Sequence, residues 1–201
     1  MITMLQYIKG NYANSLFFAP VSSADVEEII LTLRNKPGNI NTFSTSVLKR
    51  IRRKVSHVLC HIFNLSSRTG IFPDCFKLAR VTPIPKGGDS TNAGNYRPIS
   101  VLPILSKIFE KVVYKQLYTY FEQNNILYKH QYGFRRHRST VQAIRNRMQY
   151  MYDSIDSGNF VISVFLDFKK AFDTVDHKIL LSKFDFYGIR GVSMNGLYHI
   201  K

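Results

Sequence analysis

An aspartate that directly follows a run of apolar residues is the clearest candidate for chemistry in this sequence. Residues 164–180 read VFLDFKKAFDTVDHKIL, and Asp167 closes an apolar stretch that begins at Val161. A carboxylate beside buried strand residues is costly unless a partner uses it. Magnesium prefers hard oxygen ligands, and one or two carboxylates with substrate phosphates are enough to bind it. Asp167 is therefore a candidate magnesium ligand, with a helix cap or a partner for a buried arginine as structural alternatives.

Two later acidic residues, Asp173 and Asp176, are weaker candidates for the same metal. A pair of magnesium ions can activate an attacking 3′-hydroxyl and stabilise a leaving pyrophosphate, but this needs carboxylates that converge from different strands. Asp173 lies beyond a predicted turn, and Asp176 is better placed to cap the helix that follows. This stretch therefore predicts one metal ligand and not a pair.

Two basic residues could bind a triphosphate. Lys86 lies at a glycine-rich turn, and Arg97 lies in an extended segment just before a predicted helix. Arginine offers a planar fork to phosphate oxygens, and lysine offers a point charge. The alternative for each is an ordinary solvated surface charge.

The loop over residues 131–138 could contact a nucleic acid. It interleaves basic and aromatic side chains, which are Tyr132, Phe134, Arg135, Arg136, His137 and Arg138. Such a mixture suits a phosphate backbone and its stacked bases. The alternative is a solvated loop with Phe134 packed into the core.

The composition agrees with a polyanionic partner. The 201 residues include 28 Lys and Arg against 13 Asp and Glu, a formal net charge of +15. This excess favours nucleic acid, with non-specific polyanion binding as the alternative. The two cysteines are too few for a disulfide framework or a zinc site. We find no signal peptide and no apolar run long enough to cross a bilayer, so we expect an intracellular protein, nuclear or cytoplasmic and not secreted.

Both helices and strands must position these residues. Residues 1–20 show no clear period. The 3.6-residue period and the capping residues predict helices over about 23–34, 44–67, 103–123, 140–157 and 176–183, and in the helix at 140–157 the apolar residues are expected to face inward. Strands are predicted over 78–85, as an edge or hairpin arm, and over 160–167, where continuous apolarity indicates cover on both faces. The fold class is therefore α+β.

Four segments together resemble a known family. They are FPDCFKLARVTPIPK, NYRPISVLPILSKIFEKVV, QYGFRRHRST and VFLDFKKAFDTVDHKIL. In order and spacing they are similar to blocks of the reverse transcriptase of non-LTR (LINE-type) retrotransposons, close to the Jockey and CR1 groups. The resemblance covers roughly residues 15–191. It implies a right-hand polymerase, with fingers over 21–159, part of the palm over 160–191, and a divergent tail over 192–201.

The resemblance also implies roles for single residues. Asp167 would be the first metal-binding aspartate of the palm, and the Phe168 carbonyl would bind a metal, Mg²⁺ with Mn²⁺ as the alternative ion. Phe172 would exclude a 2′-hydroxyl, and Ala171 would line the same nucleotide pocket. The implied partners are a dNTP, an RNA template and a DNA primer, and no membrane. The residues implied to bind the triphosphate are Lys86 and Arg97, and those implied to lie near template and primer are Gln131, Gly133, Phe134, Arg135 and Arg138.

The sequence also departs from the family pattern. It contains no aromatic-x-Asp-Asp segment after Asp176 and no tryptophan, although the family continues with a Trp-Phe-x-Ser-Tyr helix. One permitted codon choice for residues 194–200, read two bases later, encodes Glu-Trp-Phe-Ile-Ser-Tyr, which suggests a frameshift near Ser193. We therefore expect a polymerase fragment that is inactive by itself, with a non-catalytic RNA- or DNA-binding remnant as the alternative. A poorly folding pseudogene product is the third reading, and the C-terminal third is expected to be the least stable part.

Overall fold

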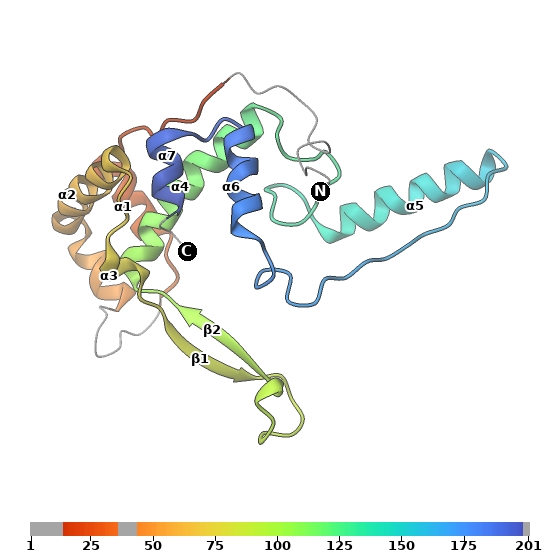
Figure 1. The fold of residues 1–201 in the computed structure, drawn as a ribbon, viewed down its shortest axis with the longest axis horizontal. Coiled ribbons are helices and arrows are strands. Elements are labelled where there is room, and N and C mark those ends of the chain that lie inside the picture. The colour runs from red at the N-terminus through yellow and green to blue at the C-terminus, as the bar shows by residue number, and fades with distance from the viewer. Residues whose placement is uncertain (1–13, 36–43, 199–201) are drawn as a thin grey trace. The chain divides into compact units, whose positions relative to one another are not determined.

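The computed structural model describes residues 14–35 and 44–198. These residues form two compact units. Figure 1 shows their helices and strands. The first unit takes the chain up to Tyr120 and again from Lys178 onward, and the second unit is Phe121–His177. The described residues are rich in helix and contain one small antiparallel sheet, which confirms the α+β class. None of their helices is both long and apolar enough to span a bilayer.

Side-chain caps start the first two helices where the sequence predicts them. Helix α1 is Ser23–Leu31. Ser22 precedes it and forms a reciprocal capping box, because its hydroxyl accepts from the Asp25 N–H and the Asp25 carboxylate accepts from the Ser22 N–H. Helix α2, Thr45–Thr69, follows the capping residue Ser44 and ends at Gly70, whose φ of 70° is left-handed.

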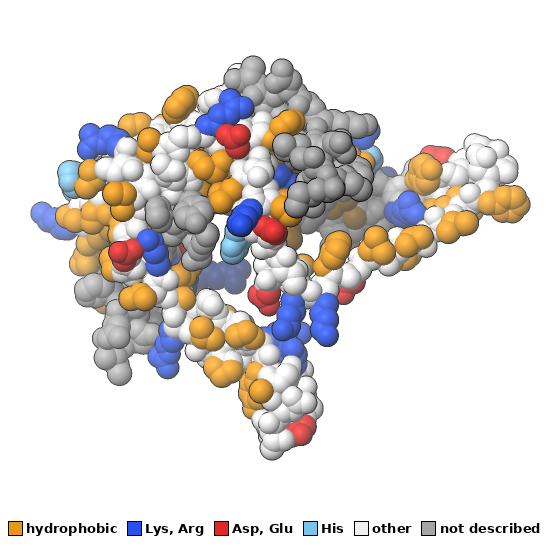
Figure 2. Space-filling model, viewed as in Figure 1, with side chains coloured by type: hydrophobic (Ala, Val, Ile, Leu, Met, Phe, Trp, Pro, Cys, Tyr) orange, Lys and Arg blue, Asp and Glu red, His pale blue; other side chains and the backbone are white. Residues whose placement is uncertain are grey.

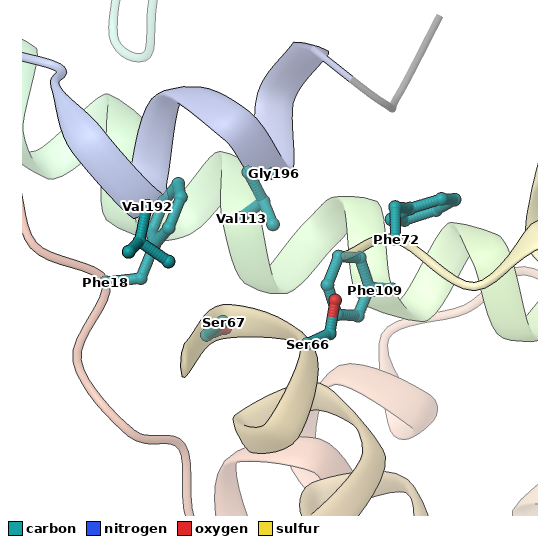
Figure 3. A pocket seen from close by; sticks show the side chains of 8 residues that line it. All are labelled: Phe18, Ser66, Ser67, Phe72, Phe109, Val113, Val192 and Gly196. Carbon is teal, nitrogen blue, oxygen red and sulfur yellow. The ribbon is translucent and has the colours of Figure 1, made fainter. Parts of the chain in front are cut away.

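The core of the first unit forms where α1 and α2 pack together with α4, Ile104–Gln123, and the short helix α3, Asp74–Lys77. Three phenylalanine rings meet edge to face at its centre: the Phe109 centroid lies 4.8 Å from Phe63 and 4.9 Å from Phe72. A cavity of about 10 Å³ lies beside them, lined by Phe18, Phe109 and Val192 among others (Figure 3). Because this volume holds about one water, the cavity is a packing defect and not a ligand site.

Two helices from the end of the described chain belong to the same unit. Helix α6 is His177–Phe186, and helix α7 is Gly191–Tyr198. Helix α7 packs on the end of α2 so closely that a Cβ added at Gly196 would lie 4.0 Å from the Gly70 Cα. Ser193 is buried there. The residues predicted to be a divergent tail therefore include a helix that packs on the first unit.

A β-hairpin contains the two described strands. Strand β1, Arg80–Pro85, pairs antiparallel with β2, Tyr96–Val101, and Ile84 lies opposite Arg97 in the register. A one-turn 3₁₀ helix, Ala93–Asn95, leads into β2. The hairpin extends from the helices of its unit, and nearly all its residues are exposed (Figure 1). The predicted strand at 78–85 is confirmed as a hairpin arm.

The second unit is built on α5, Thr140–Asp156, which confirms the predicted helix. Ser139 caps it and exchanges hydrogen bonds with Gln142. The prediction that its apolar residues face inward is wrong: Val141, Ile144 and Met148 are exposed. A row of hydrophobic side chains along this helix is visible on the surface (Figure 2).

The prediction of a strand over residues 160–167 is also wrong. The residues carry no strand, and Phe160 and Leu166 are 101% and 82% exposed. A strand exists only where a second strand accepts and donates its backbone hydrogen bonds. The two strands among the described residues pair with each other, in the other unit. The apolar run therefore has the composition of a buried strand without the pairing that would make it one.

Candidate functional site

The hairpin brings Lys86 and Arg97 to one face. Arg97 lies opposite Ile84 in the register, and the Lys86 N–H extends the pairing by donating to the Asn95 carbonyl over 2.7 Å. Lys86 and Ile84 are two residues apart, so their side chains point to the same side of the ribbon. Lys86 and Arg97 are therefore diagonal neighbours, with backbones about 7–8 Å apart. Two exposed cations at this spacing can contact one polyphosphate.

The hairpin tip between them is shaped by local hydrogen bonds. Gly87 and Gly88 adopt φ values of 102° and 88°, which side-chain-bearing residues rarely adopt. The Asp89 carboxylate accepts from the N–H and the hydroxyl of Thr91, and these bonds lower the pKa of Asp89. The Lys86 ammonium donates to the Gly94 carbonyl over 3.0 Å. The tip is therefore an ordered loop that holds the Lys86 side chain in place.

Arg135 lies in the loop over residues 131–138, here called the basic loop, and its side chain has partners within the protein. Its Nε and Nη2 atoms donate to the two carboxylate oxygens of Glu122 over 2.9 and 2.7 Å, and its Nη1 donates to the Tyr128 carbonyl over 3.1 Å. The Arg135 side chain is only 13% exposed. The guanidinium therefore ties the loop to the last turn of α4, and the contact with template or primer that the resemblance implied stays a prediction.

The other predicted residues of this loop are more open. Phe134 has a φ of 59° and is 85% exposed, so it is not the core residue that one reading predicted. Its ring meets that of Phe172 edge to face, with centroids 6.1 Å apart. The Gln131 side chain donates to the Gly133 carbonyl over 3.1 Å, and the Arg138 guanidinium lies 5.6 Å from the Tyr132 ring centroid. The structure thus brings together Phe134 and Phe172, which the sequence assigned to different parts of a site.

Asp167 is exposed and lies in a stretch without regular structure, followed by a turn that holds Ala171 and Phe172. Lys170, at a φ of 54°, starts that turn, and its carbonyl accepts from the Asp173 and Thr174 N–H groups over 2.9 and 3.2 Å. Asp173 therefore takes part in the turn through its backbone. Phe168 is exposed as well.

The fit of a metal centre can be tested on the side chains present. Over residues 14–35 and 44–198, no three His, Cys, Asp or Glu side chains gather into a group that could hold a metal ion. One carboxylate such as Asp167 can contribute to a magnesium site, but a two-metal centre needs more. The described residues therefore do not fit a complete two-metal centre. Lys86 and Arg97 belong to the first unit, and Asp167 and Phe172 to the second.

Sequence reasoning missed one feature of the second unit. A hollow of about 390 Å³ lies between the loop and α5, and it is lined by His130, Tyr132, Ala143, Asn146, Arg147 and Tyr150. The missed residues are those on the helix. Their positions 143, 146, 147 and 150 follow the i, i+3, i+4, i+7 pattern of one helix face, a signal that was present in the sequence but mixes polar and aromatic types.

The sequence is similar to one protein family and to three proteins of Drosophila melanogaster. The model of the family described as "Reverse transcriptase (RNA-dependent DNA polymerase)" matches residues 84–199. Over 170 residues, 82% of this chain, the sequence is 33% identical to "Probable RNA-directed DNA polymerase from transposon BS" of Drosophila melanogaster. It is 32% identical over 161 residues to the protein from transposon X-element and 29% identical over 181 residues to that from mobile element jockey, both of the same fly.

The aligned part is a small share of these relatives. It takes in 79% of this chain for the X-element protein and 89% for the jockey protein. It spans 19%, 18% and 20% of the length of the BS, X-element and jockey proteins respectively. The chain therefore corresponds to about a fifth of each of them. The family match includes the hairpin residues Lys86 and Arg97, the basic loop and Asp167.

Proposed function

Because the chain belongs to the reverse transcriptase family, we propose that it is the nucleotide- and template-contacting part of a non-LTR retrotransposon polymerase. In the intact enzyme a primer 3′-hydroxyl attacks the α-phosphate of a dNTP opposite an RNA template, and pyrophosphate leaves. The observation that carries the proposal is the family match over residues 84–199, because that one span contains every residue proposed for the site.

Lys86 and Arg97 are proposed to bind the triphosphate of the incoming nucleotide. Their place on one face of an exposed hairpin supports this role, since both side chains can reach the same triphosphate from that face. Arginine can form two parallel bonds to phosphate oxygens, and lysine adds a point positive charge. Together they would neutralise and orient the leaving pyrophosphate.

The second unit is proposed to contribute the carboxylate and the sugar contact. Asp167 would be one metal-binding carboxylate of a two-metal centre, with the Phe168 carbonyl beside it and Mg²⁺ or Mn²⁺ as the ion. Ala171 and Phe172 would contact the deoxyribose, and the aromatic ring of Phe172 would exclude a 2′-hydroxyl. The exposure of Phe172 and its edge contact with Phe134 support a surface that another molecule covers.

The loop is proposed to lie near template and primer through Gln131, Gly133, Phe134 and Arg138. Arg135 would act there as a positioning residue, since Glu122 and Tyr128 accept hydrogen bonds from its Nε, Nη1 and Nη2 atoms. This refines the role that the sequence suggested for it.

Photo-crosslinking of an azido-dATP to the 201-residue chain tests the nucleotide site. We expect Lys86→Gln and Arg97→Gln to reduce labelling severalfold each. Arg80→Gln is the matched control: Arg80 lies on the same hairpin face, about 20 Å from Lys86 at the strand rise of about 3.3 Å per residue. Equal labelling of all three variants would count against the assignment.

The second candidate function is nucleic-acid binding without catalysis, favoured by the net charge of +15 and by the incomplete metal site among the described residues. The two functions separate in a primer-extension assay on an RNA template with Mg²⁺. We propose that the 201-residue chain binds the hybrid in a salt-sensitive way but does not extend the primer. Extension that Asp167→Asn abolishes would show that the chain completes the metal site by itself.

A further inference from the structure

The hollow between the basic loop and α5 has the chemistry of a stacking site. It lies wholly within the second unit, and its described lining residues include two tyrosines, a histidine, an asparagine and an arginine, but no acidic residue. We propose that this hollow binds an unpaired nucleotide of a single-stranded RNA. The inference deepens the proposed function, on which it rests, by naming a partner contact on helix α5.

One helix face and one loop segment build the site. Asn146, Arg147 and Tyr150 lie on the same face of α5, and Tyr132 comes from the loop opposite. The Asn146 amide donates to the Tyr132 hydroxyl over 2.5 Å. This bond fixes one tyrosine ring against the helix at the edge of the hollow. A ring that is fixed before binding loses little side-chain entropy when a base stacks on it.

An arginine guanidinium also lies over the ring of each tyrosine. The Arg138 guanidinium lies 5.6 Å from the Tyr132 ring centroid, and the Arg147 guanidinium lies 5.8 Å from that of Tyr150. Arg147 in addition donates to the Ser163 hydroxyl over 2.7 Å, so its position is held from a second side. An aromatic ring with a guanidinium over it combines a stacking surface with a positive charge, which matches the alternation of base and phosphate along a single strand.

The volume of the hollow and its tyrosine rings favour an unpaired base over a duplex. The volume of about 390 Å³ is within the range of small-ligand sites, which is about 300–1,000 Å³. In a duplex the faces of the bases are covered by their neighbours, so the tyrosine rings would have nothing to stack on. The site is also separate from the exposed apolar row of α5, because Val141, Ile144 and Met148 lie on a different helix face from Asn146 and Tyr150.

Fluorescence anisotropy of a labelled oligouridine of about 12 nucleotides, a length in the range of single-strand binding sites, tests the proposal on the full chain. Tyr150→Leu should weaken binding about tenfold, and Tyr150→Phe should bind like the wild type because the ring is kept. The matched control is Tyr152→Leu. Tyr152 is on the same helix and is 57% exposed against 61% for Tyr150, but it does not line the hollow.

Arginine variants supply an independent pair. Arg147→Gln should weaken binding severalfold, whereas Arg145→Gln removes the same charge from another face of α5 and should have a smaller effect. Both residues lie on α5, so the pair matches net charge and helix context. An oligouridine–oligoadenosine duplex should show no difference between Tyr150→Leu and Tyr152→Leu.

Three results would overturn the site. The first is an equal loss of probe binding in Tyr150→Leu and Tyr152→Leu. The second is a loss of duplex binding in Tyr150→Leu that equals its loss of single-strand binding. The third is displacement of the probe by polyglutamate as readily as by unlabelled RNA. Failure of the broader proposal looks different, because the wild type would then not bind the probe even at low salt. Binding that is strong and salt-sensitive but indifferent to Tyr150 would contradict the stacking site alone.

Discussion

Arg135 and Glu122 form a two-pronged ion pair, with nitrogen–oxygen distances of 2.9 and 2.7 Å. The pair joins the basic loop to the last turn of α4, and the Arg135 side chain is largely buried. A lysine could not reproduce these two parallel bonds, since its ammonium lacks the planar fork of arginine. The loop over residues 131–138 is thus held by Arg135, a residue whose charge alone would suggest a contact with nucleic acid.

The first prediction concerns this pair. Arg135→Ala or Glu122→Ala should each destabilise the second unit, because each leaves a partly buried charge without its partner. A double-mutant cycle in urea should give a coupling of about 1–2 kcal/mol, between the values for exposed and buried pairs. Arg138→Ala, an exposed arginine of the same loop, is the control and should show little coupling to Glu122→Ala. A coupling near zero for Arg135 would mean that the pair does not hold the loop.

The second prediction concerns a half-buried carboxyl in the first unit. Burial raises the pKa of Glu110, and nearby Lys107 partly offsets this effect. The folded state therefore binds the proton more tightly than the unfolded state, and stability is lost as pH rises through the raised pKa. Glu110→Gln should be more stable than the wild type at pH 7, and the difference should vanish below the usual carboxyl pKa.

Urea unfolding at a series of pH values measures this difference. Glu28→Gln is the control, since Glu28 is exposed and its ion pair with Lys115 spans 3.7 Å at the surface. We expect that variant to be neutral or slightly destabilised at pH 7. A Glu110→Gln variant that is destabilised at neutral pH would mean that the carboxylate is better solvated or better paired than its burial indicates.

The third prediction concerns Gly188, which has a φ of 88°. A Cβ there would lie 2.1 Å from the Asn14 carbonyl oxygen and 2.5 Å from the Tyr120 hydroxyl. That hydroxyl lies 2.8 Å from the carbonyl oxygens of Asn14 and Tyr187, so three chain segments meet at this point. Gly188→Ala should lower the free energy of unfolding by about 3 kcal/mol or more, through steric overlap added to backbone strain.

Gly158→Ala separates these two causes. Gly158 has a φ of 75°, but a Cβ there would have no neighbour within 4 Å. We expect a loss of only about 1 kcal/mol, which is the cost of a left-handed alanine. Thermal unfolding of both variants measures the difference. Equal losses would show that the segments around Gly188 move apart at little cost.

The fourth prediction concerns the exposed apolar run. Phe160, Val164 and Phe165 are largely exposed, so a polar replacement removes little buried surface. Phe160→Ser with Phe165→Ser should leave the urea midpoint almost unchanged and should reduce light scattering at high protein concentration. By contrast, Ile30→Ser, at a fully buried position, should lower the midpoint strongly. A large midpoint loss in the double variant would show that the run packs against the protein in solution.

Local rules explain which helices were predictable. Leu48, Leu59 and Phe63 repeat at helical spacing along α2, and all three are buried. Ser22, Ser44 and Ser139 precede helices at the places where a hydroxyl can accept from a free N–H. These signals lie within a few residues of the structure they specify, so the chain order alone carries them. The same is true of the four sequence blocks that indicated the family, and of the net charge.

Contacts between residues far apart in the chain could not be predicted in this way. The apolar run at 160–166 has the composition of a strand, but pairing is a property of two segments, and it forms no strand in this fold. Arg135 and Phe134 are adjacent and both looked like nucleic-acid contacts, yet one is held by Glu122 and the other is exposed beside Phe172. The sequence determined the helices that have a clear apolar period, the serine caps and the family. Only the tertiary structure decided which side chains face each other, because that depends on which segments meet.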